Sequence, residues 1–318
     1  MNYILLNDTS HTLNVGCQGT CRALKYLYFK NGHKLLHSYP LGFATEYFIP
    51  SFNTRKKKLS YTTWKETTEK LSHKLKPIFK DVDFVLINGE GTLHHNRLAT
   101  ASLLGLTRAI QLMGIPTALV NCTIQDLPEN LLETVNDCNY LAIRDALSFQ
   151  YIKNKGINCI QSSDSIFLAD TEKIVGPQNL IGFSPGVNAL TESPKRIVRR
   201  FQNTVTQDRD TAYITIESED VALEAFFEPF ASKIFPLGSI TINNVAELFA
   251  HCKAIVSGRY HLGILAWMHR VPVTFLESNS WKIDGLLRLA GLNPEPAIIP
   301  EISTMENLRK LALNNVYL

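Results

Sequence analysis

An arginine and a histidine separated by one residue, Arg259 and His261, stand between a predicted strand and a predicted helix. The apolar run at residues 254–257 predicts the strand, Gly258 follows it, and a helical apolar pattern begins two or three residues later. Ligands of open α/β sheets bind at the carboxyl ends of the strands. Because a helix N-terminus adds N–H groups and a positive partial charge, this turn is typical of a phosphate or carboxylate site. The alternative is a surface or capping pair.

A carboxylate between two glycines follows another buried strand, which is predicted at residues 83–87. The sequence there is Asn88-Gly89-Glu90-Gly91-Thr92-Leu93-His94-His95. A glycine-rich turn at a strand end gives Glu90 little packing in the core. It is therefore a candidate general acid or base, and the alternative is a carboxylate that caps the helix predicted at residues 97–113.

A polar loop with two glycines follows the first predicted strand, residues 3–6, and precedes a helix predicted at residues 21–30. Asn14 and Gly16 lie in this loop, where glycine lets the backbone approach a ligand. The spacing does not match a dinucleotide-binding fingerprint. Two thiols one helical turn apart, Cys17 and Cys21, do not make a metal site by themselves.

Length and composition indicate a globular protein of two domains. The chain has 318 residues, of which 45% are hydrophobic and 19% charged, as is usual for folded domains. A net charge of +3 gives no indication of nucleic-acid binding. No apolar run reaches the roughly 20 residues of a membrane span, and the N-terminus does not look like a signal peptide. We therefore expect a cytoplasmic protein, with reduced cysteines and no metal, since the six cysteines show no zinc spacing.

Strands and helices alternate along the whole chain, which predicts parallel sheets of the doubly wound kind. A polar segment at residues 170–178 divides an N-terminal domain, residues 1–170, from a C-terminal domain, residues 178–318. The closing helix is predicted at residues 305–313. A basic run at residues 55–58 is interpreted as a solvated loop, a mobile flap or a contact with an acidic membrane surface.

Four motifs in this order resemble the polysaccharide pyruvyl transferases, and the likeness covers most of the chain. They are the segments 88–95, 142–148, 164–167 and 257–261, with the downstream apolar stretch and Lys282 also fitting the pattern. The resemblance implies two Rossmann-like α/β domains, GT-B-like, with a cleft between them and the last helix crossing back to the first domain. It also implies transfer of the enolpyruvyl unit of phosphoenolpyruvate to two hydroxyls of a sugar.

The resemblance assigns the binding of phosphoenolpyruvate to Arg259 and His261, and Gly258 of the same turn is also an expected donor-binding residue. Lys282 is the expected second cation for the donor carboxylate, against the alternative of an exposed helix lysine. The chemistry needs an acid and a base, for which Glu90 is the first candidate and Asp164 the second, while His261 is placed to protonate the leaving oxygen. The expected acceptor-binding residues are Asn14, Gly16, Asn88, His94 and His95. The family often has an acidic residue where this chain has Cys17.

We expect phosphoenolpyruvate as donor substrate without a further cofactor. The expected acceptor is a sugar or a lipid-linked oligosaccharide of a capsule or exopolysaccharide pathway, with peripheral contact at the inner face of the membrane. Two rivals stay open at this point. One is a GT-B glycosyltransferase that places Arg259 and Lys282 on a nucleotide diphosphate and Glu277 on its ribose. The other is a non-catalytic sugar-binding subunit of a polysaccharide pathway.

Overall fold

A computed structural model describes residues 1–48, 61–186, 210–295 and 297–317 of the chain. The chain divides into two compact units. The N-terminal unit consists of Met1–Thr9, Leu24–Ser165 and Lys310–Leu318, and the C-terminal unit of Ser10–Ala23 and Ile166–Arg309. The sequence-based division had placed residues 10–23 in the N-terminal domain, whereas the structure groups them with the C-terminal unit.

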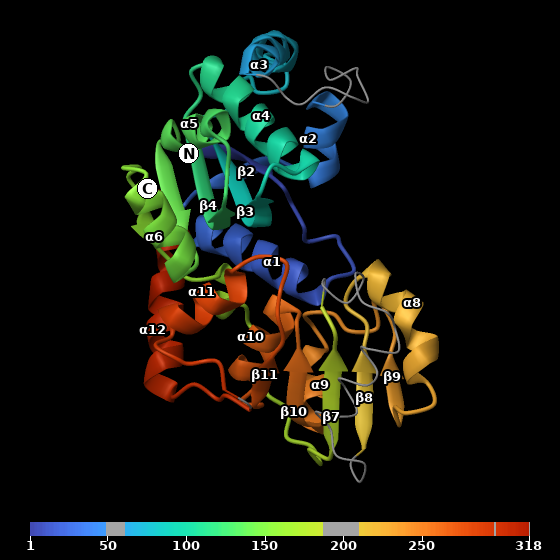
Figure 1. Cartoon of the computed structure of the whole chain (residues 1–318). Coiled ribbons are helices and arrows are strands. Elements are labelled where there is room, and N and C mark those ends of the chain that lie inside the picture. Colours follow the sequence, from blue (N-terminus) through green and yellow to red (C-terminus); the bar gives the residue numbers. More distant parts are fainter. Residues whose placement is uncertain (49–60, 187–209, 296, 318) are drawn as a thin grey trace. The chain divides into compact units, whose positions relative to one another are not determined.

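The N-terminal unit contains a six-stranded parallel sheet in the order β2-β1-β3-β4-β5-β6 (Figure 1). Its strands are β1 (Asn2–Leu6), β2 (Lys34–Tyr39), β3 (Phe84–His94), β4 (Thr117–Gln125), β5 (Tyr140–Ile143) and β6 (Ile160–Gln161). The strands β1 and β3 are neighbours, and the chain runs from β1 to β2 on one side of this pair and from β3 to β4 on the other. The carboxyl ends of β1 and β3 therefore form a topological switch point, where open α/β sheets bind ligands.

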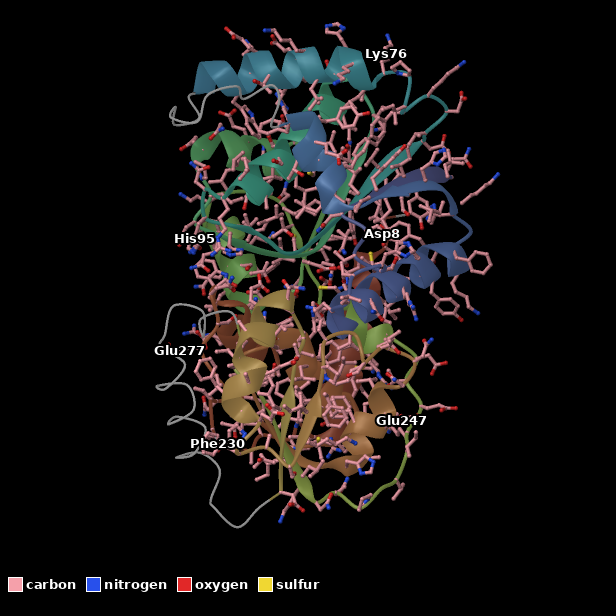
Figure 2. The ribbon with its side chains drawn as sticks, turned by 90° about the vertical axis from the view of Figure 1, so that its right-hand side faces the viewer. Asp8, Lys76, His95, Phe230, Glu247 and Glu277 are labelled. Atoms are coloured by element: carbon pink, nitrogen blue, oxygen red, sulfur yellow. The ribbon has the colours of Figure 1, made fainter. Side chains whose placement is uncertain are left out.

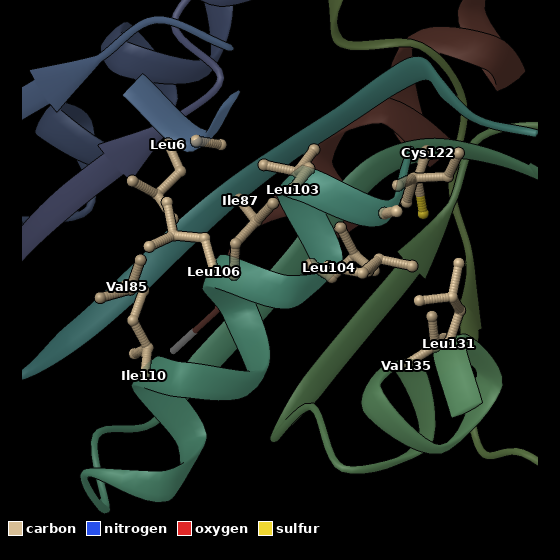
Figure 3. Packing of buried hydrophobic residues seen from close by; sticks show 14 of the residues in the cluster. Leu6, Val85, Ile87, Leu103, Leu104, Leu106, Ile110, Cys122, Leu131 and Val135 are labelled. Atoms are coloured by element: carbon tan, nitrogen blue, oxygen red, sulfur yellow. The ribbon is translucent and has the colours of Figure 1, made fainter. Parts of the chain in front are cut away.

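Helices of the N-terminal unit bury their apolar faces on this sheet or on a neighbouring helix. They are α2 (Leu41–Phe48), α3 (Tyr61–Leu75), α4 (Leu98–Leu112), α5 (Glu129–Asn136), α6 (Ala146–Asn154) and the later turns of α1 (Val15–Lys30). Of these, α2, α3 and α5 pack mainly on α4. Figure 3 shows the central part of the core, in which α4 contributes Leu103, Leu104, Leu106 and Ile110. The strands beneath are apolar on consecutive residues, as expected where both faces of a parallel sheet are covered.

The C-terminal unit repeats the plan with five parallel strands in the order β11-β10-β7-β8-β9. The strands are β7 (Leu180–Ser184), β8 (Thr211–Ile214), β9 (Lys233–Phe235), β10 (Cys252–Ser257) and β11 (Val273–Phe275). The helices are α8 (Ser218–Phe227), α9 (Val245–His251), α10 (Tyr260–Met268), α11 (Lys282–Leu289) and α12 (Ile302–Ala312), with a short 3-10 turn at Ser165–Leu168. A second 3-10 turn, Leu313–Asn315, follows α12 and belongs to the N-terminal unit. Here the switch point lies between β7 and β10.

The predicted fold class of two Rossmann-like parallel-sheet units is confirmed, but two local predictions near the site were wrong. The helix after the first strand begins at Val15 rather than Cys21, because the Asn14 side chain accepts hydrogen bonds from Gly16 N (2.9 Å) and Cys17 N (3.2 Å) and caps it. The segment around Glu90 is not a turn but a continuation of β3. The basic run at residues 55–58 lies outside the described residues, as do residues 194–207, for which the sequence predicts a basic helix.

The end of α10 carries a histidine that is held neutral. Burial lowers the pKa of the His269 imidazole from its ordinary 6.5 to about 4, and Lys173 acts in the same direction. The ring stacks on Phe249 with 5.0 Å between ring centroids, and among the described residues its buried Nε2 has no hydrogen-bond partner. Folding therefore disfavours the protonated form of this side chain.

We expect His269 to make stability depend on pH in a defined window. Its contribution is complete above pH 6.5 and is lost as the pH falls from 6.5 towards 4, since the unfolded chain then binds a proton that the folded chain excludes. His269→Gln, which cannot titrate, should flatten the decline of the melting temperature in this window. An unchanged slope in the variant would assign the pH dependence to other groups.

Candidate functional site

Two glycines bring together the strand ends at the switch point of the C-terminal unit. Gly258 N donates to Ser184 O at 3.0 Å, which joins the end of β10 to the end of β7. A Cβ on Gly258 would lie 2.6 Å from Pro185 O, and one on Gly186, whose φ is 86°, would lie 2.7 Å from Gly258 Cα. Both positions therefore require glycine. Gly258, a predicted donor-site residue, allows this close approach beside Arg259.

Arg259 lies buried at the N-terminus of α10, with an exposed fraction of 8%. Its Nη2 donates to Asp220 Oδ1 at 2.5 Å. Its Nε is also buried, and within the described part of the chain no acceptor reaches it. Ser184 Oγ at the neighbouring strand end is likewise buried without a partner among the described residues. A buried polar group without a partner is costly, and an oxyanion is a ligand that could satisfy this guanidinium.

His261, in the first turn of α10, packs against the first turns of α1. Its Nε2 lies 3.4 Å from Thr20 Oγ1. Gly16 lies so close to the imidazole that an added Cβ would be 2.0 Å from His261 Cβ and 2.6 Å from its Nδ1. The Asn14 side chain, which caps α1, also donates to Glu217 Oε1. Gly16 thus contacts the candidate donor residue His261, whereas Asn14 contacts Glu217 at the start of α8, and the predicted role of Asn14 and Gly16 in acceptor binding stays a prediction.

The contact between Gly16 and His261 has a measurable consequence. Gly16→Ala should displace the imidazole or shift the start of α1, with a loss of about 1–3 kcal/mol in the free energy of unfolding from overpacking. Donor-dependent activity should fall with it. The matched control is Gly42→Ala in α2, where an added Cβ meets nothing within 4 Å and helix propensity improves. A Gly16→Ala protein with the melting temperature and activity of the wild type would contradict the contact.

A second cation stands near the end of β11. Lys282 is the first residue of α11 and is partly buried. Its Nζ donates to Asn279 Oδ1 at 3.1 Å. Glu277, the residue that a ribose-binding role would need, is exposed after β11 (Figure 2). Arg259 lies just after the end of β10, and Lys282 begins the helix that follows the adjacent strand β11. Two cations suit a dianionic or more highly charged ligand.

Glu90 lies at the switch point of the N-terminal unit in a strained backbone. Its φ is 41°, and the pairing of β3 with β4 shifts register between Glu90 and Leu93. The carboxylate is buried, and its Oε1 accepts from Thr9 Oγ1 at 2.5 Å and from Asn88 Nδ2 at 2.7 Å. The N-cap of α4, Arg97, makes no side-chain capping bond. A left-handed non-glycine residue that aims a buried carboxylate is typical of a functional position.

Asn88 holds this carboxylate and is itself held by asparagines of the neighbouring chain segments. Asn7 Nδ2 donates to Asn88 O at 2.6 Å, and Asn121 Nδ2 donates to Asn88 Oδ1 at 3.2 Å. Asn315, from the C-terminal segment, accepts from Asn121 N at 3.0 Å. Asn7 and Asn121 both have a left-handed φ, 58° and 55°, a conformation that asparagine tolerates better than most residues. Asn88 therefore belongs to a buried polar network that fixes Glu90.

The two histidines that the sequence suggested for acceptor binding, His94 and His95, differ in exposure. His94, the last residue of β3, is buried, whereas His95 has a φ of 56° and is partly exposed. His95 Nδ1 lies 3.5 Å from Asp126 Oδ2, and the two imidazoles meet edge to face with 5.4 Å between centroids. His95 is labelled in Figure 2. Of the two, His95 is the more accessible to a ligand.

Asp164, the second candidate carboxylate, forms a fully buried ion pair. Its Oδ2 lies 2.6 Å from Arg144 Nη1, and both side chains are at most 1% exposed. Arg144 Nε also donates to Thr123 Oγ1 at 3.0 Å. Removal of one partner of such a pair strongly destabilises a protein, because the other charge is left buried. The geometry favours a structural role for Asp164 and makes Glu90 the better candidate for acid–base chemistry.

The described residues show neither a metal site nor a membrane-spanning helix. They contain no group of three His, Cys, Asp or Glu side chains arranged to hold a metal ion. Among them, no helix combines the length and the apolarity needed to cross a membrane.

Solved structures with the same fold place the protein in a class. The UDP-GlcNAc 2-epimerase from Methanocaldococcus jannaschii has a TM-score of 0.56 at 12% identity, covering 99% of this chain and 93% of that chain. The UDP-GlcNAc 2-epimerase from Neisseria meningitidis, bound to UDP-GlcNAc, has a TM-score of 0.56 at 12% identity, covering 98% and 94%. At such identities the likeness shows the fold alone. The protein has the GT-B-like fold of two parallel-sheet α/β units.

The family follows from the sequence itself. No curated protein sequence matches the chain. The sequence model of the polysaccharide pyruvyl transferases matches residues 17–280, and the chain belongs to this family. The predicted resemblance is confirmed. Membership makes the protein a transferase of polysaccharide biosynthesis, and the matched span includes Glu90, Arg259 and His261.

Proposed function

We propose that the protein transfers the enolpyruvyl unit of phosphoenolpyruvate to a sugar of a cell-surface polysaccharide or its precursor, forming a pyruvate ketal. The observation that carries the proposal is the buried guanidinium of Arg259. It lies at a topological switch point, Asp220 fixes one of its nitrogens, and its Nε has no acceptor among the described residues. An oxyanion could accept a hydrogen bond from this Nε, and family membership supports phosphoenolpyruvate as the source of the oxyanion.

The residues of the C-terminal unit suit the charges of this donor. A phosphate monoester carries about two negative charges at neutral pH, and the carboxylate adds another. Arg259 can bind one oxyanion through its fixed fork, and Lys282, which begins the helix after the adjacent strand β11, can bind a second. His261 stands in the first turn of α10, next to Arg259. It would donate to the phosphate and protonate the leaving oxygen.

The reaction adds one acceptor hydroxyl oxygen to C2 of the enol while C3 takes up a proton and becomes a methyl group. A second hydroxyl then displaces phosphate from C2, and its proton leaves with the phosphate, which closes the ketal. Both steps need a proton acceptor near the attacking oxygen and a proton donor near C3 or the leaving group. Glu90 is the proposed carboxylate, Asn88 holds it in place, and His95 is a polar group for the acceptor sugar. That these residues act on the same substrates as Arg259 is a requirement of the reaction and stays a prediction.

Family membership supports a sugar or polysaccharide acceptor, and a lipid-linked oligosaccharide is the precursor form that we propose beside it. The basic run at residues 55–58, which the sequence suggested for contact with an acidic membrane surface, falls outside the described residues. Peripheral membrane contact and a cytoplasmic location therefore stay expectations.

The donor can be tested without knowledge of the acceptor. Thermal melting of the purified protein should show stabilisation by phosphoenolpyruvate, with about 2.7 kcal/mol expected at a ligand concentration 100 times the dissociation constant. UDP-GlcNAc and inorganic phosphate serve as comparison ligands. Stabilisation by the nucleotide sugar alone would indicate a glycosyltransferase. Stabilisation by free saccharides alone would indicate a sugar-binding subunit.

A further inference from the structure

Asp220 uses both of its carboxylate oxygens, and the two have different partners. Oδ1 accepts from Arg259 Nη2 at 2.5 Å. Oδ2 accepts from the backbone N–H groups of Ile216 (3.0 Å) and Glu217 (3.1 Å). The second set of bonds closes a capping box at the start of α8, in which Asp220 is the third helical residue. One buried side chain therefore joins the start of α8 to the guanidinium at the start of α10.

We propose that Asp220 is a positioning residue for the donor anion, an inference that rests on the proposed function of Arg259. The helix cap fixes the carboxylate, and the carboxylate in turn fixes the guanidinium by one nitrogen. The buried Nε is then left to the ligand. An arginine whose orientation is set before the ligand arrives loses less side-chain freedom on binding, and binding is tighter for that reason.

Two other roles for Asp220 make different forecasts. If the carboxylate mainly neutralises Arg259, its removal should raise the local positive potential and tighten the binding of an anion. If it serves only as a helix cap, its removal should lower stability and leave donor affinity unchanged. The positioning role alone predicts weaker binding of the donor through Arg259. Burial favours the positioning role. Asp220 is 1% and Arg259 8% exposed, so solvent does not screen the interaction between the two charges.

Asp220→Asn and Asp220→Glu separate these roles. An amide has one acceptor oxygen, so the asparagine side chain of the first variant cannot serve both the α8 backbone and Arg259. Glutamate is the usual third residue of a capping box. Asp220→Glu should therefore keep the cap and the melting temperature while its longer side chain moves the carboxylate relative to Arg259. We expect each variant to bind phosphoenolpyruvate about 10-fold or more weakly by calorimetry, the scale of one hydrogen bond to a charged group.

The matched control is Glu224→Gln. Glu224 lies on the same helix, and its Oε1 accepts from Thr215 Oγ1 at 2.6 Å without serving Arg259. It should bind the donor like the wild type. In an Arg259→Lys background the effect of Asp220→Glu should vanish, because a positioning residue acts through its partner. Equal or tighter donor binding by Asp220→Glu, or an equal loss in both backgrounds, would overturn the inference.

Binding of phosphoenolpyruvate and of UDP by the wild-type protein distinguishes a wrong role for Asp220 from a wrong proposed function. If wild type binds UDP and not phosphoenolpyruvate, the proposed donor is wrong, and the same variants measured with UDP still test the positioning of Arg259. If wild type binds neither anion, both proposals are overturned.

Discussion

Replacing Glu90 with glutamine should lower turnover by a factor of about 10²–10⁴ while the affinity for phosphoenolpyruvate stays unchanged. The amide keeps the size of the side chain and an oxygen that can accept from Thr9 and Asn88, so the buried network survives. What is lost is a carboxylate that can take or give a proton in the transition state. A defect in turnover without a defect in donor binding marks an interaction made only in the transition state.

Three measurements on the Glu90→Gln protein decide between this role and a structural one: turnover, donor binding and melting temperature. Loss of a helix cap would instead cost about 1 kcal/mol of stability and leave the chemistry largely intact. Glu66→Gln, a change at an exposed position of α3 in the same unit, is the control. Turnover near that of the wild type would remove Glu90 from the chemistry and return attention to Asp164.

Arg259→Lys should lower kcat/KM for phosphoenolpyruvate by a factor of about 100, since at least one hydrogen bond to a charged group is lost and each is worth about 1.5–3 kcal/mol. Lysine keeps the charge but has no planar fork, so it cannot hold Asp220 and present a second fixed donor to the ligand. Steady-state kinetics at low and at saturating donor should show the loss, and the melting curve should stay cooperative.

The control for this change is Arg108→Lys. Arg108 pairs with Asp137 at 2.6 Å, but both side chains are substantially exposed, and such pairs contribute about 0–1 kcal/mol. The same substitution there should leave donor kinetics unchanged. Near-normal turnover of Arg259→Lys at both donor concentrations would argue against a clamp at this position.

The sequence predicted the strand–helix alternation because parallel strands covered on both faces are apolar runs that stand out from amphipathic helices. It also placed Arg259 and His261 correctly at a strand end followed by a helix. The irregular backbone of β3 was missed. Gly89 and Gly91 are typical of a turn, and only the pairing with β4 shows that the strand continues past Glu90.

The partners of the candidate residues were the least predictable part. Asp220 is 39 residues from Arg259 in sequence, and nothing in its local pattern distinguishes a helix-capping aspartate from one that also holds an arginine. The asparagine network, in contrast, is partly visible in the sequence. Asn7, Asn88 and Asn121 each directly follow a predicted apolar strand, and adjacent parallel strands bring such positions together. Asn315 lies far along the chain, and only the tertiary structure joins it to them.

The most direct measurement of the central claim follows the donor itself during the reaction. Wild-type protein is incubated with phosphoenolpyruvate and a panel of oligosaccharide and lipid-linked acceptors, and phosphorus and proton NMR spectra are recorded over time. We predict that inorganic phosphate and the methyl signal of a pyruvate ketal appear at equal rates, and that both nearly disappear with Arg259→Lys. Intact phosphoenolpyruvate in samples where the same protein consumes a nucleotide sugar would contradict the account.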